Sequence, residues 1–103
     1  MDVEASELGK YKKTVTQAIE RKWHRYRQNY ADYATFGSLR LKFKVNGSGK
    51  PINLKTVRNN SNAIMTEFTL KSVIDADIPP MPKKINELLK GRGLEITYDV
   101  IIY

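Results

Sequence analysis

The last ten residues of this 103-residue chain alternate strictly between two sets of side chains. This period of two is typical of a β-strand with one buried and one outer face. Such a strand cannot bury its apolar face alone, so it requires neighbouring strands and a covering layer. The inward set is Leu94, Ile96, Tyr98, Val100 and Ile102, and the outward set is Glu95, Thr97, Asp99, Ile101 and Tyr103.

Two earlier segments have the same period. Apolar residues alternate with cationic ones from Leu39 to Val45, and the alternation continues from Ile52 to Thr56. Between them lies Asn46–Pro51, which is rich in turn-forming residues. These segments predict a β-hairpin with a loop longer than two residues.

Helical spacing dominates the first thirty residues. Between Glu7 and about Tyr30, apolar residues recur at intervals of three and four, which is typical of one face of an α-helix. Ser6 is the expected N-cap. The expected apolar stripe is Leu8, Tyr11, Val15, Ala18, Ile19, Trp23, Tyr26 and Tyr30.

A second helix is expected from Ala63 to about Asp77, after a cluster of turn- and cap-forming residues at Asn59–Asn62. The prolines within Ile78–Pro82 must end it, and a short helix is expected over Lys83–Lys90. The expected buried side of the second helix is Ile64, Met65, Phe68, Val73 and Ile74.

These elements predict an α+β fold for residues 1–103 as a single domain. Its expected architecture is a two-layer sandwich, with a small three-stranded antiparallel sheet covered on one face by two main helices. The expected order is helix, strand, strand, helix, short helix, strand.

Composition excludes several kinds of site. The chain has no cysteine, so disulfides, thiolate metal sites and thiol nucleophiles are excluded. With only one histidine, a metal site built mainly from imidazoles is excluded too. No apolar run approaches the roughly 18–20 residues of a membrane span.

The net charge of +7 is concentrated in the first half of the chain. Residues 1–50 hold eleven basic and five acidic side chains, whereas residues 51–103 hold seven and six. Such an excess attracts an anionic partner, which is nucleic acid, anionic lipid or an acidic protein. The sign of the charge does not choose among these.

No catalytic arrangement stands out. His24 lies on a cationic helix and is expected to be a solvated side chain rather than a general base. Asp75 and Asp77 are expected to be solvated charges near a helix end. Gly47–Lys50 resembles only a fragment of a phosphate-binding loop and lies in a hairpin. The chain is therefore expected not to be an enzyme, and no cofactor or metal is expected.

The basic and aromatic run Arg21–Arg27 is a candidate nucleic-acid surface, because bases stack on aromatic rings and arginine binds phosphate. However, Trp23 and Tyr26 belong to the apolar stripe, and we expect them to hold the helix to the sheet. Nucleic-acid binding is therefore the secondary hypothesis.

The final strand suggests a binding surface. If it lies at the sheet edge, it offers unpaired backbone groups to a strand of another chain. The sequence leaves open whether this strand lies at the edge or inside an ordinary sheet.

The layout resembles the C-terminal domain of the TonB/TolA energy-transducer family. The matching pieces are the helix end at Ile19–Trp23, the glycine-led strand Gly37–Val45, the turn Asn46–Ile52, the helix start Asn60–Asn62, the proline cluster Ile78–Pro82 and the closing strand Ile96–Val100. The Tyr-Pro pair that precedes the first strand in TonB itself is absent. This absence leaves open whether the chain is closer to TonB or to TolA.

The resemblance implies a non-enzymatic periplasmic interaction domain, anchored to the inner membrane by a segment absent from this chain. Through that N-terminal region it would contact inner-membrane motor proteins. The domain itself would bind an outer-membrane receptor segment by strand addition and transmit force for transport. A strand-exchanged homodimer is a further possibility.

On this hypothesis, the outward side chains of the final strand contact the partner strand. They are Glu95, Thr97, Asp99, Ile101 and Tyr103. Cations of the first helix would steer an acidic receptor segment toward the site. These are Lys12, Lys13, Arg21, Lys22 and Arg25.

Overall fold

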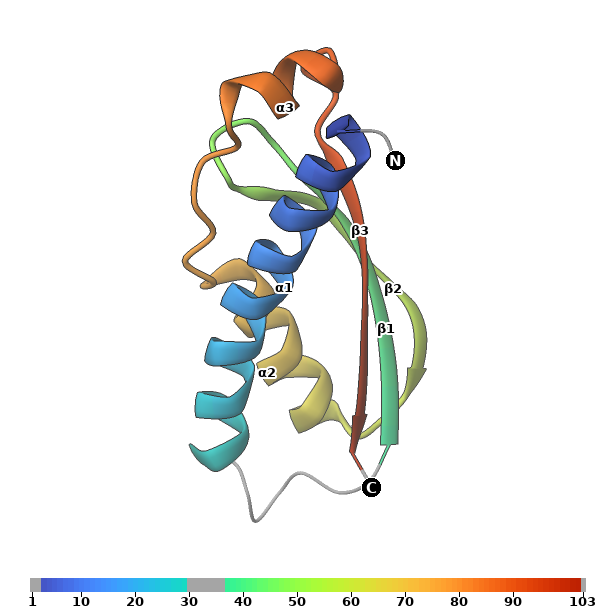
Figure 1. Ribbon diagram of the computed structural model, residues 1–103. Helices are drawn as coiled ribbons and strands as arrows, with labels where there is room; N and C mark the ends of the chain where they lie inside the picture. Colours follow the sequence, from blue (N-terminus) through green and yellow to red (C-terminus); the bar gives the residue numbers. More distant parts are fainter. Residues whose placement is uncertain (1–2, 30–36, 103) are drawn as a thin grey trace.

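The computed structural model describes residues 3–29 and 37–102, which form three helices and one three-stranded sheet (Figure 1). The elements are α1 (Val3–Asn29), β1 (Gly37–Val45), β2 (Pro51–Asn60), α2 (Ala63–Ile74), α3 (Lys83–Leu88) and β3 (Leu94–Ile102). Helices α1 and α2 cover one face of the sheet, and α3 lies at one end (Figure 1). The predicted two-layer α+β fold and its order of elements are confirmed.

The sheet is antiparallel with the order β2-β1-β3. Strand β1 is central, so β2 and β3 are the two edge strands. The pairing of β1 with β3 is continuous over nine residue pairs, from Gly37 with Ile102 to Val45 with Leu94. The pairing of β1 with β2 is interrupted twice, between Arg40 and Leu41 and between Lys42 and Lys44.

The core lies between the sheet and the helices, where apolar stripes of every main element meet. From α1 it receives Tyr11, Val15 and Ile19, and from β3 it receives the whole inward set that the sequence predicts. The inward residues of β1 lie beside those of β3 on the sheet side of the core. They are Leu39, Leu41, Phe43 and Val45, all no more than 2% exposed.

Helix α1 begins at Val3, so the expected N-cap, Ser6, lies inside the helix. Residues 3–5 include no glycine or proline that would prevent helix formation there. None of the helices in the described part of the chain combines the length and apolar character that crossing a bilayer requires.

Helix α2 ends at Ile74 rather than Asp77, with Asp75 as its C-cap. The prolines from Pro79 onward prevent the helix from continuing through residues 78–82. Ile74 is 62% exposed, contrary to expectation, because the buried stripe passes to one side of it. That stripe includes two polar residues that the hydrophobic pattern missed, and its members are Met65, Phe68, Thr69, Ser72 and Val73.

The polar segment after β1 forms the predicted turn. The cluster Asn59–Asn62, expected to form turns and helix caps, is divided between the end of β2 and the start of α2. Asn59 and Asn60 are the last residues of β2 rather than turn residues. Asn62 is the N-cap of α2, where its side chain accepts a hydrogen bond from the Met65 amide at 2.7 Å.

Candidate strand-binding edge

The final strand of the chain lies at an edge of the sheet. Strand β3 pairs only with β1, and no other described strand pairs with its outer side. Because alternate residues of an edge strand point their N–H and C=O groups away from the sheet, β3 carries a row of backbone groups available to another strand. The sequence could not establish this position, and the structure establishes it.

The opposite edge differs from β3 in regularity. Strand β2 has two register interruptions, and Asn53 within it has a positive φ of 55°. Its exposed side chains include Lys55 and Arg58. Bulges and cations are the usual means by which proteins prevent pairing at a sheet edge. Strand β3 has neither, and its burial alternates without interruption over all nine residues.

The outward side chains of β3 lie on the open face of the sheet. Glu95, Thr97, Asp99 and Ile101 are all exposed, as predicted, and Ile101 is 56% exposed. Tyr103, the fifth predicted contact residue, lies outside the described residues. The structure therefore presents three polar side chains and one apolar side chain along this edge.

Two of these outward residues are bonded to the central strand. Arg40 Nε donates to Asp99 Oδ1 at 2.6 Å, and Lys42 Nζ lies 2.6 Å from Glu95 Oε1. The hydrogen bond and the charge of Asp99 raise the pKa of Arg40. The hydrogen bond and the charge of Lys42 lower the pKa of Glu95. Because both pairs are exposed, solvent and salt screen them, and neither is a main source of stability.

Two hollows lie near the C-terminal end of β3, one on each face of the sheet. On the open face, a hollow of about 180 Å³ borders Ser38, Arg58 and the segment 99–101. On the helix side, a hollow of about 230 Å³ lies between β3 and α1. A strand added beside β3 would direct alternate side chains to opposite faces, so those on the helix side would lie beside the second hollow.

The helix-side hollow contains residues that were not predicted as site residues. Glu20, Trp23 and His24 line it from α1, and Tyr98 lines it from β3. The helical spacing puts Glu20, Trp23 and His24 on neighbouring turns of one side of α1. However, only the sheet order reveals that this side faces the free edge.

Trp23 and Tyr26 join α1 to α2 rather than to the sheet, which corrects the expectation. Trp23 Nε1 donates to Thr69 Oγ1 at 3.0 Å, and its ring lies 5.6 Å from that of Phe68. The Tyr26 hydroxyl donates to Asp75 Oδ2 at 2.9 Å. Both rings are half-buried, so neither presents a fully open face on which a nucleic-acid base could stack.

The cations proposed for steering lie along α1 in different surroundings. Four are exposed, and they are Lys12, Lys13, Arg21 and Arg25. Lys22 is partly buried, and its Nζ lies 3.7 Å from Asp77 Oδ2. The positive charge of Lys12 makes a small contribution to the lowered pKa of Glu95.

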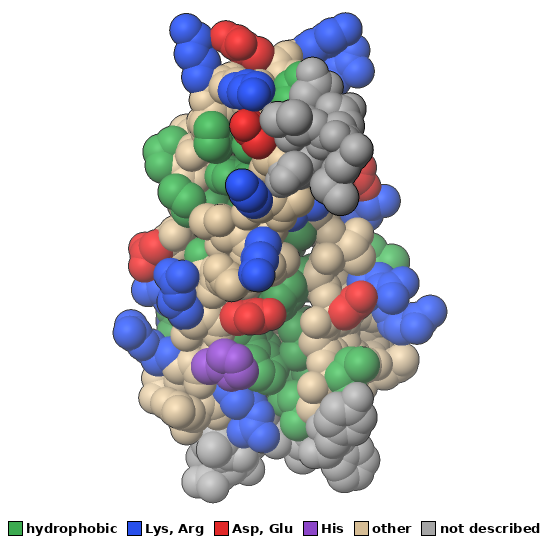
Figure 2. All heavy atoms as spheres, viewed as in Figure 1, with side chains coloured by type: hydrophobic (Ala, Val, Ile, Leu, Met, Phe, Trp, Pro, Cys, Tyr) green, Lys and Arg blue, Asp and Glu red, His purple; other side chains and the backbone are tan. Residues whose placement is uncertain are grey.

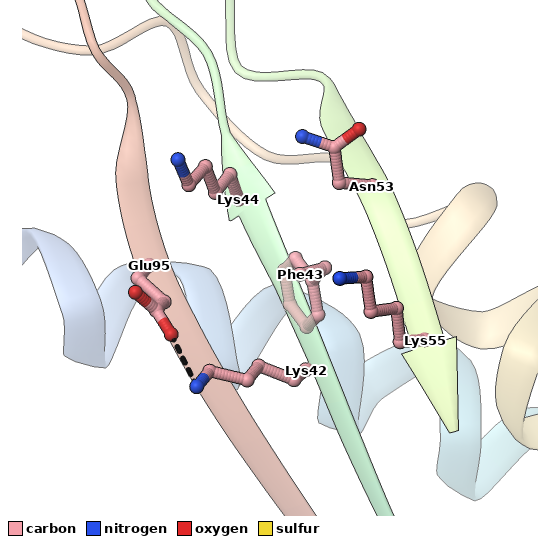
Figure 3. A pocket seen from close by; sticks show the side chains of 6 residues that line it. All are labelled: Lys42, Phe43, Lys44, Asn53, Lys55 and Glu95. Carbon is pink, nitrogen blue, oxygen red and sulfur yellow. Dashed lines mark ion pairs between the residues drawn. The ribbon is translucent and has the colours of Figure 1, made fainter. Parts of the chain in front are cut away.

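A second basic region lies on the open face of the sheet. A shallow hollow of about 420 Å³ is lined there by three lysines of β1 and β2 together with Asn53 and Glu95. In Figure 3, Lys42 and Lys44 extend toward β3 while Lys55 extends toward β1. Lys42 is already paired with Glu95. The three ammonium groups therefore do not converge on a single anion.

The fold has a counterpart among solved structures. The chain is similar to the TonB C-terminal domain of Helicobacter pylori, determined by NMR in solution, with a TM-score of 0.63. The two sequences are 18% identical, and the match covers 90% of this chain and 79% of that domain. No protein-family model matches the chain, and no curated protein matches it in sequence. The predicted resemblance to a TonB-like C-terminal domain is therefore confirmed at the level of the fold.

Proposed function

We propose that this chain is a non-enzymatic interaction domain of a TonB-like energy transducer, and that it binds an extended receptor segment by strand addition at β3. The observation that carries the proposal is the contrast between the two sheet edges. Strand β3 has a regular alternation of burial and contains no lysine or arginine. The pairing of β2 with β1 is interrupted twice. A regular edge accepts a partner strand, and a bulged edge resists one.

Strand addition would derive affinity and selectivity from different groups. Backbone hydrogen bonds along 94–102 would provide affinity that depends little on sequence. Side chains of the partner would lie beside Glu95, Thr97, Asp99 and Ile101 on the open face, and would meet the helix-side hollow on the other. Tyr103 is included in the proposed contact set from the sequence pattern.

The proposed setting follows from the likeness to a TonB C-terminal domain. The domain would act in the periplasm, anchored to the inner membrane and coupled there to motor proteins through an N-terminal region. It would transmit force to an outer-membrane receptor. The exposed cations of α1 would accelerate the encounter with an acidic partner at low salt.

An amide NMR titration of the labelled domain tests strand addition. The probes are two versions of one seven-residue Thr/Val peptide, N-methylated at complementary sets of alternate residues. A methylated amide cannot donate a ladder hydrogen bond, so we expect one version to shift the amides of 94–102 and the other to be inactive. Equal behaviour of the two versions, or shifts away from β3, would contradict the proposal.

Nucleic-acid binding remains the alternative, supported by the basic surface of α1 and the lysines of the open sheet face. It predicts an affinity for an oligonucleotide that falls steeply with salt, in proportion to the phosphates contacted. Trp23 and Tyr26 disfavour it, because both rings are half-buried where α1 meets α2 and leave little face on which a base could stack. In the same experiment, shifts confined to Lys10–Arg27 upon addition of a single-stranded oligonucleotide would favour the alternative.

A further inference from the structure

The hollow between α1 and β3 is placed to receive a side chain of an added strand. Its lining consists of Glu20, Trp23 and His24 on one side and the segment 98–101 on the other. Figure 2 shows hydrophobic side chains along the seam between α1 and β3, with acidic side chains beside it and the single histidine of the chain, His24, at its margin. Since β3 has a free outer edge, an inward side chain of a strand paired there would enter this seam.

The aromatic walls of the hollow are held in place. Trp23 is fixed by its hydrogen bond to Thr69 and by its contact with Phe68. Tyr98 belongs to the core and is only 6% exposed. Flat, fixed rings accommodate the methylene stem of a long side chain and attract a cation placed over them.

The charge of the hollow is negative, although the chain as a whole is positive. Glu20 is exposed, and among the described residues no ion pair includes its carboxylate. Asp99, the other carboxylate of the lining, is already bonded to Arg40. Burial raises the pKa of Tyr98 above its usual value, and the charge of Glu20 raises it further. The negative field of Glu20 therefore reaches the inner wall.

We propose that this hollow is a side-chain pocket that selects a lysine or arginine of the added strand, an inference that rests on the proposed function. The methylene stem lies against Trp23 and Tyr98, and the cationic group pairs with the Glu20 carboxylate. A receptor segment that is acidic overall is attracted by the net positive charge of the chain. One basic residue at an inward position of that segment then pairs with Glu20 in the pocket. The pocket thereby sets which residue of the segment lies opposite 98–101.

Three synthetic peptides test this selection. The first is Thr-Val-Thr-Lys-Thr-Val-Thr, and the other two have norleucine or glutamate in place of lysine. Norleucine keeps the stem and removes the charge, so we expect its Kd from NMR titration to be about three- to tenfold weaker than that of the lysine peptide. The glutamate peptide should bind most weakly. The preference for lysine should decline as salt is added, because the pair is partly exposed.

Two matched variants locate the effect. Both Glu20→Gln and Glu67→Gln remove one negative charge, but Glu67 is an exposed residue of α2 that does not line the hollow. We expect the preference for lysine over norleucine to disappear in E20Q and to persist in E67Q. If E20Q retains the preference, or if all three peptides shift the β3 amides with equal affinity, the pocket is wrong while strand addition stands. If none of the peptides shifts those amides, strand addition fails and the pocket fails with it.

Discussion

Gly49 occupies a point where the β1–β2 turn approaches the proline-rich segment before α3. Its φ is +87°, and a Cβ added there would lie 2.7 Å from the Ile78 carbonyl oxygen and 2.8 Å from that of Pro79. The Met81 amide also donates to the Gly47 carbonyl at 3.0 Å. This residue therefore has two requirements, a left-handed backbone and the absence of a side chain.

Gly91 has only the first of these requirements, the left-handed backbone. Its φ is +72°, but a Cβ there would meet nothing within 4 Å. We expect Gly91→Ala to cost about 1 kcal/mol through backbone strain alone. Gly49→Ala should cost about 1–3 kcal/mol more, because backbone atoms must also move. Urea denaturation measures both, and equal losses would contradict the close approach.

The hydrogen bond from Trp23 to Thr69 joins α1 to α2. Thr69 is fully buried, so Trp23→Phe leaves its hydroxyl without the indole donor. We expect this change to cost about 1–3 kcal/mol. The double variant with Thr69→Val should cost less than the sum of the two single changes, by about 1 kcal/mol. Additive losses of unfolding free energy would show that the hydrogen bond contributes no coupling.

At the scale of the element, β3 should differ from β1 in backbone protection. Both sides of β1 are paired, whereas no strand among the described residues pairs with the outer side of β3. We expect slow amide hydrogen exchange at every regularly paired residue of β1, but alternating fast and slow exchange along 94–102. Native-state exchange measured by NMR checks this. Uniform protection along β3 in the free protein would mean that another chain already covers its edge, as in a homodimer.

Sequence patterns predicted the elements well but not the order of the strands. The alternation of 94–102 defines which side chains of β3 are buried, and every one of them was predicted correctly. Its position at the edge depends on where the chain returns after α2 and α3, and no local pattern contains that information. The helix-side hollow could not be predicted for the same reason, since Glu20 and Tyr98 are distant in sequence.

Two smaller errors have local causes. The alternation of Ile52, Leu54 and Thr56 looked regular, although an extra residue at Asn53 disrupts its pairing with β1. Thr69 was not expected in the core because it is polar. Yet its spacing of four from Met65 places it on the buried stripe, and the indole of Trp23 satisfies its hydroxyl. Here periodicity is a better guide than polarity.

At the scale of the whole molecule, one core joins the helices and the sheet, so the chain should unfold as a unit. Ile19 is fully buried in that core, and Ile74 is 62% exposed. We expect Ile19→Ala to cost about 2–5 kcal/mol and Ile74→Ala to change stability by no more than about 0.5 kcal/mol.

Two probes follow this unfolding, namely Trp23 fluorescence, which reports on the contact of α1 with α2, and far-UV circular dichroism. Their transitions should coincide in the wild-type chain and in both variants. Separate transitions would show that α1 detaches before the sheet unfolds. A large effect of I74A would contradict its position outside the core.

The direction of β3 has a mechanical consequence. The molecule is elongated, with extents of 43 × 25 × 22 Å, and α1 and β3 both run along its length (Figure 1). A strand paired with β3 would also lie along this axis, with its ladder bonds directed across it. Tension along the axis would then load all of these bonds together in shear. Tension applied across the axis at one end of the added strand would instead break the bonds one after another, so the same contact would be strong in one direction and weak in the other.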